Sequence, residues 1–365
     1  MMSRSRINRY LDDHGAPPPP GFSILLLSMC LMTYHPDLVP PSANSLDQET
    51  LYVTTKTLFG LVQASFPPSL HLIQATMIMA TYEYANGKTN DAFASIGLCA
   101  RMGYAAHIDN AHPSQKMEAE EYSENEAKAN TWWNILMCER TFLCETDLKH
   151  PLSTKLPRNT TSHRDDETSK ERVSSTPKSE TENIDAGGFA CVMQATYLLD
   201  QVIKALDMTD FESRYNQLHG LDHTLQTVLA VIMDQSQGRG GIYCTAIIIL
   251  LRALIIIHSH NLTYITTELN LNPESILKEK DKRLESSHAA MKTIATMVDE
   301  ISTTHTSVLS LVDRIPPSFV YVIREVIKYI ENAEFRVDEW DDVESRLSSS
   351  SRKFEYRWGG RQIYA

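Results

Sequence analysis

The sequence lacks the residue clusters that hold metals or phosphates. None of its cysteines has a second cysteine or a histidine at the spacing of a zinc site. The glycines at positions 238, 240 and 241 lack the lysine or the spaced third glycine of a phosphate-binding loop. No nucleophile elbow or paired-histidine zincin motif occurs. We therefore find no candidate catalytic residue, and we expect a protein that is not an enzyme and a chain that holds no cofactor.

Positive charge and long apolar runs are also scarce. The chain has 34 Lys and Arg against 46 Asp and Glu, and its net charge of -12 repels a polyanion. The two longest apolar runs, Phe22 to Met32 and Ala246 to Ile257, are shorter than the roughly 20 residues that cross a bilayer. We interpret both as buried helices and expect no membrane partner.

The six cysteines are dispersed, which is typical of a reducing compartment. Most lie in apolar stretches, where a thiol behaves as a small hydrophobic group. They are Cys30, Cys99, Cys138, Cys144, Cys191 and Cys244.

Helical periodicity and end signals predict three helices in the first half of the chain. Ser69 is placed to cap a helix that ends at Gly87. A second helix is expected to stop at Gly103, in the left-handed conformation that glycine tolerates. Ser123 and Glu126 form a capping box at the start of a third. We expect these helices to span residues 70–86, 89–103 and 123–144.

No segment alternates like a strand, so the sequence predicts an all-α protein. After a polar stretch, helical patterning resumes at about 190–206, 211–233, 242–260, 274–304 and 317–332. The expected organisation is a disordered N-terminus at 1–20, a helical core at 21–157, a disordered polar linker at 158–186, a second helical part at 187–333, and an acidic then basic disordered tail at 334–365.

Six short motifs resemble one protein family in their order and spacing. They are Pro-Ser-Leu (Pro68 to Leu70), Ile-Gln-Ala-Thr (Ile73 to Thr76), Tyr-Glu-Tyr (Tyr82 to Tyr84) before Gly87, Ala-Arg-Met-Gly (Ala100 to Gly103), Trp132-Trp133 before Glu139-Arg140, and Leu156-Pro157. Together they resemble the fungal-specific transcription factor domain, the middle homology region of zinc binuclear cluster proteins. The resemblance covers about residues 22–157.

This resemblance implies a multi-helix regulatory domain of a nuclear transcription regulator. Its implied partners are the transcription machinery or a coactivator, a second family member in a homo- or heterodimer, and a small-molecule effector. Family members typically begin with a DNA-binding module. Six closely spaced cysteines in that module hold two zinc ions. This chain starts about twenty residues before the domain, so we expect zinc and DNA only through a missing N-terminal module. The alternative is a non-DNA-binding interaction protein that modulates a complete family member or a coactivator.

Trp132, Trp133 and Arg140 allow two interpretations. They could form an aromatic box with a cation for an effector, or they could be core anchors with a paired arginine, and we favour the core. Because adjacent helix positions diverge by about 100 degrees, the two tryptophans need at least two packing partners.

Two histidine motifs resemble metal ligands only partly. His219 and His223 have ligand spacing with Asp222 between them, yet no third ligand is evident. Glu285 and His288 make one Glu-x-x-His, whereas di-iron bundles need two copies. We expect no metal at either motif.

The last segment has two candidate roles. Its acidic part, Glu334 to Glu344, has the composition of an activation segment, with Phe335 and Trp340 presented to a coactivator, but a solvated helix end is the simpler interpretation. Its basic part could stack on nucleic acid, although a short disordered tail is again simpler. The residues concerned are Arg352, Lys353, Arg357, Arg361, Phe354, Tyr356, Trp358 and Tyr364.

Overall fold

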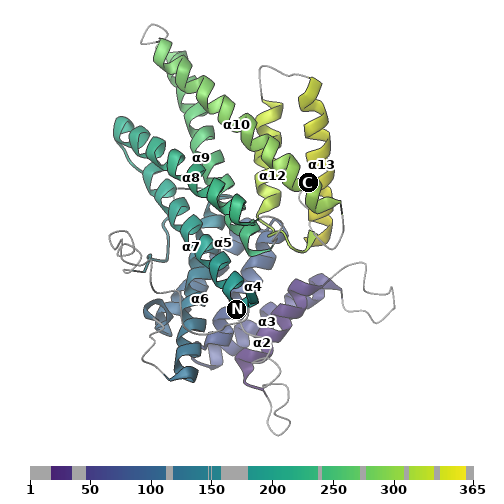
Figure 1. Ribbon diagram of the computed structural model, residues 1–365. Coiled ribbons are helices and arrows are strands. Elements are labelled where there is room, and N and C mark those ends of the chain that lie inside the picture. Colours follow the sequence, from purple (N-terminus) through teal and green to yellow (C-terminus); the bar gives the residue numbers. More distant parts are fainter. Residues whose placement is uncertain are drawn as a thin grey trace. The chain divides into compact units, whose positions relative to one another are not determined.

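Helices make up the regular structure of this protein. The computed structural model describes residues 18–34, 47–111, 118–146, 148, 150–157, 180–236, 241–271, 277–307, 312–332 and 338–358. No strand occurs within these ranges, which confirms the prediction of an all-α fold. The chain divides near residue 178 into two units, each with its own core (Figure 1).

The first unit is built around one helix that is buried on nearly all sides. Its elements are α2 (Pro20–Thr33), α3 (Gln48–Ser65), α4 (Leu70–Ala85), α5 (Thr89–Ala105), the 3-10 helix η1 (Ile108–Asn110) and α6 (Ala119–Leu143). Helix α4 packs against α2, α5 and α6. Because α4 is apolar on all faces, it can be enclosed by these neighbours, and it forms the centre of the unit.

The ends of α4 follow the sequence signals. The backbone N–H of Leu72 donates to the Ser69 hydroxyl over 3.3 Å, as expected of an N-cap. Gly87 follows the helix with a φ of 75°, a left-handed conformation that glycine adopts without steric cost. Both predicted ends of this helix are confirmed.

Helix α5 does not end at Gly103, so that prediction was wrong. The helix continues to Ala105, and His107 is the residue with positive φ, at 55°. Gly103 instead makes room for a neighbouring ring, since a Cβ built on it would lie 3.0 Å from Cζ3 of Trp132. Glycine is therefore needed here because the Trp132 ring packs directly on the helix backbone.

The predicted capping box at Ser123 is also wrong. Helix α6 begins at Ala119, so Ser123 lies inside it. Glu120 and Glu121 occupy the first turn, where carboxylates interact favourably with the helix dipole. Lys128 and Glu124 form an ion pair of 2.7 Å one turn further on. These charges support the start of the helix without a side-chain cap.

The second unit surrounds the apolar helix α9. Its helices are α7 (Glu180–Leu206), α8 (Phe211–Ser236), α9 (Ile242–Leu271), α10 (Leu277–Thr306), α12 (Phe319–Glu331) and α13 (Asp338–Trp358). Helix α9 packs against α7, α8 and α10, and it lies between α8 and α10 (Figure 1). Tyr243–Tyr264 is long and apolar enough to cross a membrane, but 72% of its apolar window is buried in the structure. Packing by three helices accounts for its composition, as predicted for the Ala246 to Ile257 run.

Two segments expected to be disordered contain helix. Helix α7 begins at Glu180, inside the predicted linker. Helix α13 occupies most of the predicted tail, with Leu347 and Phe354 buried and the Phe354 ring edge-on to Phe319 at 5.6 Å. Its apolar residues recur at helical spacing, which makes one buried face despite a polar composition. Residues 1–17, 158–179, 334–337 and 359–365 of the predicted disordered segments lie outside the described residues.

Candidate functional site

The two tryptophans and Arg140 lie in the packed interior of the first unit. Trp132 is 2% exposed and Trp133 is 8% exposed. The Trp132 ring meets Tyr104 edge-on, with ring centroids 4.9 Å apart, and also covers Gly103. These contacts leave no open aromatic box, and they bear out the interpretation of core anchors.

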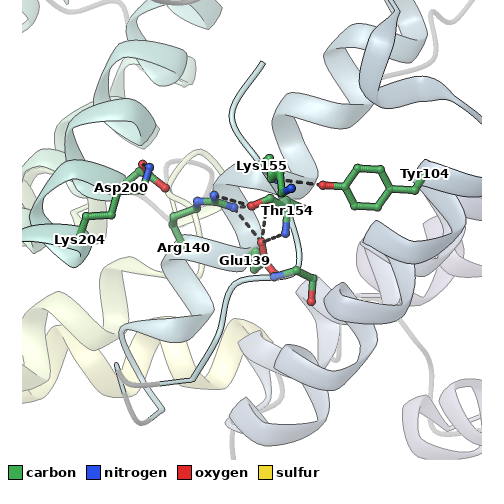
Figure 2. Close-up of polar contacts among 8 residues, drawn as sticks. Tyr104, Glu139, Arg140, Thr154, Lys155, Asp200 and Lys204 are labelled. Carbon is green, nitrogen blue, oxygen red and sulfur yellow. Dashed lines mark hydrogen bonds and ion pairs between the residues drawn. The ribbon is translucent and has the colours of Figure 1, made fainter. Parts of the chain in front are cut away.

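Arg140 is a paired, structural arginine (Figure 2). Its Nη1 donates to Oε2 of Glu139 over 2.8 Å and to the Thr154 hydroxyl, and its Nη2 donates to the Thr154 carbonyl over 3.1 Å. Oε2 of Glu139 also accepts the backbone N–H of Thr154. Nearby, the backbone N–H of Lys155 donates to the Tyr104 hydroxyl over 3.0 Å. This network fixes the segment after α6 against α5 and α6, and it uses the charges of Glu139 and Arg140 for packing.

The histidine motifs are used for helix contacts. Asp222 of α8 faces α9, where its Oδ1 lies 3.3 Å from Nε2 of His258. His219 stacks parallel to the Tyr215 ring, and Nδ1 of His288 lies 3.1 Å from the Tyr329 hydroxyl. In the described part of the chain, no three His, Cys, Asp or Glu side chains are grouped to hold a metal.

Most of the described cations of the predicted basic tail are engaged within the second unit. Arg352 donates to the Ser348 carbonyl, Lys353 donates to the Thr306 carbonyl, and Arg357 pairs with Asp313. Phe354 is buried in the core. The hypothesis of a free basic and aromatic tail is therefore wrong for residues up to 358, and Arg361 and Tyr364 lie outside the described residues.

The acidic segment is likewise part of the fold where it is described. Trp340 is half-buried and meets the Tyr329 ring edge-on, with centroids 6.4 Å apart. This tryptophan is therefore not presented freely to a coactivator. Phe335 lies outside the described residues.

A pocket that the sequence did not reveal lies in the second unit, where α8 and α10 flank α9. Its volume is about 280 Å³. Leu254, His258 and Ile294 form a buried floor, and the exposed Gln226, Ala230 and Thr293 lie at the rim. Seven of its ten lining side chains are apolar. Such a lining, with a few polar groups, is typical of small-molecule sites.

A second, polar pocket adjoins it at His258. This pocket has a volume of about 600 Å³, and its lining includes His219, Asp222 and Lys282. Arg283 also lines it and stacks over the Tyr215 ring at 3.8 Å. His258 therefore lines both the apolar and the polar pocket, and Asp222 lines the polar one.

His258 is the unusual polar group of this site. It is 4% exposed, and neither of its ring nitrogens has a hydrogen-bond partner among the described residues, although Nε2 lies 3.3 Å from Oδ1 of Asp222. Oδ1 of Asp222, beside its Nε2, also accepts a hydrogen bond of 2.9 Å from Gln226. Burial tends to raise the pKa of Asp222, but the interactions with His258 and Gln226 outweigh it and lower that pKa. Asp222 is therefore ionised near neutral pH.

Sequence reasoning singled out Asp222 and missed His258. The available signal was a histidine placed directly after the apolar run that ends at Ile257. A polar residue at the end of a buried helix face needs a partner, and neither ring nitrogen of His258 has a hydrogen-bond partner among the described residues.

Comparisons with known proteins concern the first unit. Residues 3–162 match the family described as fungal specific transcription factor domain. Over 110 residues the chain is 29% identical to "Transcription factor BOA15" of Botryotinia fuckeliana (strain B05.10), and this alignment covers 30% of the chain and 59% of that relative. No solved structure matches significantly. Residues 3–162, less than half of the chain, are therefore similar to the fungal specific transcription factor domain.

Proposed function

We propose that the protein is a nuclear transcription regulator of the fungal zinc-cluster family, and that the helical units described above are its regulatory part. The observation that carries this proposal is the family match over residues 3–162, which contains every helix of the first unit. The regulatory part responds to an effector or a partner and passes its state to the transcription machinery. DNA and zinc are bound through a separate module, and the chain has no catalytic role.

The use of polar groups in the first unit supports a regulatory rather than a catalytic role. Two of its buried charges, Glu139 and Arg140, bond to each other and to Thr154. Glu83 is bonded in the same way by Tyr52 over 2.8 Å and by Lys56 over 2.6 Å. Groups that are held by neighbours in this way stabilise the packing and are not directed at a substrate.

The direct test is to tether the chain to a reporter promoter. We expect a fusion to a heterologous DNA-binding domain to change reporter transcription several-fold in yeast, relative to that DNA-binding domain alone. A Glu139→Ala fusion leaves Arg140 buried without its carboxylate and is expected to lose the effect. An expressed, nuclear wild-type fusion that leaves transcription unchanged contradicts the proposal.

A second candidate is an interaction protein that does not bind DNA itself and modulates a complete family member or a coactivator. The net charge of -12 and the engagement of Arg352, Lys353 and Arg357 within the second unit favour it. Mapping the transcript upstream of Met1 separates the two candidates. An in-frame segment with six closely spaced cysteines supports the first, and a start at Met1 supports the second.

A further inference from the structure

We propose that Cys244 is a site of covalent modification by α,β-unsaturated carbonyl compounds, and that His305 acts as the base for this reaction. The two residues lie in the second unit, outside residues 3–162, which the family match covers. The site therefore goes beyond the proposed regulatory function and does not depend on it.

Two helices of the second unit bring the thiol and the imidazole together. Cys244 lies in the first turn of α9, and His305 lies in the last turn of α10, which packs against α9. The Sγ atom of Cys244 is 3.8 Å from Nε2 of His305, which is within reach of a hydrogen bond that involves sulfur. Both residues are partly exposed, so the pair is not enclosed in the core. A cysteine and a base within hydrogen-bond reach form the arrangement that activates a thiol nucleophile.

A second hydrogen bond of His305 determines which ring nitrogen can accept a proton from the thiol. Nδ1 of His305 lies 2.9 Å from the backbone carbonyl of Ile301. Because a carbonyl oxygen only accepts hydrogen bonds, Nδ1 carries the proton of this contact. In the neutral ring Nε2 is then the acceptor, and Nε2 is the atom that faces Cys244.

The surroundings of the thiol make a base necessary. Burial raises the pKa of Cys244 and outweighs the backbone hydrogen bonds at Gly241 and Cys244, which lower that pKa. The thiol therefore remains protonated near neutral pH, whereas the thiolate is the nucleophile. Transfer of the thiol proton to Nε2 of His305 supplies the thiolate at the moment of reaction.

The path of this proton favours an addition reaction. Sγ of Cys244 forms a bond to the β-carbon of the unsaturated carbonyl compound while the C=C π bond breaks, and that electron pair moves toward the carbonyl group as an enolate. Nε2 of His305 accepts the thiol proton and returns it to the α-carbon. The product is a thioether, so atoms and charge balance without a leaving group, an oxidant or a second thiol.

Cys191 provides a matched control within the same chain. It also lies in the second unit, it is partly exposed, and burial raises its pKa as well. No hydrogen bond joins its thiol to a histidine in the described part of the chain. The two thiols therefore differ in the presence of a base at the sulfur.

The rate of modification by N-ethylmaleimide tests the proposal on the purified full chain. We expect Cys244 to react at least about tenfold faster than Cys191 near neutral pH, because a positioned base contributes at least that factor. Mass spectrometry of peptides from samples quenched at successive times measures both rates. Equal rates, or a slower reaction at Cys244, overturn the proposal.

A variant tests the role of His305. His305→Gln keeps a side-chain N–H that can donate to the Ile301 carbonyl but has no basic nitrogen. It is expected to slow the reaction at Cys244 at least about fivefold and to leave the rate at Cys191 unchanged. A rise in the Cys191 rate identifies a variant that has lost its fold, and the comparison within the wild-type chain then decides. An unchanged rate at Cys244 in the folded variant overturns the assignment of His305 as the base.

The reporter assay is independent of this test. An active reporter fusion together with equal rates at the two thiols overturns the modification site alone. Selective modification of Cys244 together with a silent reporter fusion counts against the proposed function and leaves the modification site in place.

Discussion

The contact of Gly103 with Trp132 yields the sharpest prediction about the first unit. Replacing glycine by alanine inside a helix normally stabilises a protein, by about 0.5–1 kcal/mol, because glycine loses more backbone freedom on folding. At Gly103 the added methyl group would lie 3.0 Å from Cζ3 of Trp132 and 3.3 Å from Cγ1 of Ile108. Trp132 is buried and cannot move into solvent. We therefore expect Gly103→Ala to destabilise the protein.

The magnitude follows from a matched variant on the same helix. At Gly97 the nearest atom to an added Cβ is Oγ of Ser153 at 3.5 Å, which is an ordinary contact. Gly97→Ala should therefore gain the usual ~0.5–1 kcal/mol. Gly103→Ala receives the same gain but loses about 1–3 kcal/mol through overpacking. The difference between the two variants isolates the clash, at about 1–3 kcal/mol.

Urea unfolding of the full chain measures this difference. With a slope of about 2 kcal/mol per molar, a change of 1 kcal/mol moves the midpoint of the transition by about 0.5 M. We expect a lower midpoint for Gly103→Ala and a higher one for Gly97→Ala, each relative to the wild type. Trp132→Phe in the Gly103→Ala background should recover part of the clash, because the smaller ring leaves room for the methyl group. Equal midpoints for the two glycine variants would refute the account of close packing.

Three further predictions concern charge and capping. Glu139→Ala removes the buried carboxylate that pairs with Arg140 and accepts the backbone N–H of Thr154, so it should lower the free energy of unfolding by about 3–5 kcal/mol in urea titrations. Ser69→Ala removes the N-cap of α4 and should lower the free energy of unfolding by about 1 kcal/mol. Ser69→Asp should keep most of the stabilisation that the cap provides, because aspartate also accepts the backbone N–H at this position. The pKa of Asp222 is lower in the folded protein than in the unfolded chain, where it is about 3.9. The ionised side chain therefore stabilises the folded protein above about pH 3.9, and this stabilisation is lost as the pH falls through the lowered pKa. Asp222→Asn should therefore reduce the melting temperature at pH 6, and the reduction should become smaller as the pH falls below about 3.9. A difference that stays constant on acidification contradicts the linkage.

Local signals in the sequence were sufficient for the helices whose ends are set by neighbouring residues. The apolar pattern of α4, its cap at Ser69 and its end at Gly87 all depend on contacts within a few residues. Gly103 was misassigned because its role depends on Trp132, which approaches from a different helix. A glycine at the end of an apolar pattern looks the same in sequence whether it turns the chain or admits a ring.

Helix α13 was missed because its composition is polar. Serines and charges dominate the segment, and only its apolar residues at helical spacing, such as Leu347 and Phe354, indicate a buried face. The pairing of Arg346 with Asp299 of α10, at 2.6 Å, further fixes the helix and depends on tertiary structure. Composition therefore predicted disorder where spacing favoured a helix.

The candidate site lay beyond the reach of sequence reasoning for a similar reason. Asp222 and His258 are both visible in the sequence, but their proximity depends on the register of α8 against α9. The pocket further requires α10 on the other side of α9. The absence of a hydrogen-bond partner for either ring nitrogen of His258 within the described residues can be recognised only when all three helices are in place.

The central claim, that this protein regulates transcription, is tested most directly by chromatin occupancy in its native host. The protein, tagged at its own locus, should be enriched at a discrete set of promoters, and deletion of its gene should change transcription from those promoters. Uniform absence from chromatin, together with unchanged transcription after deletion, would contradict the account.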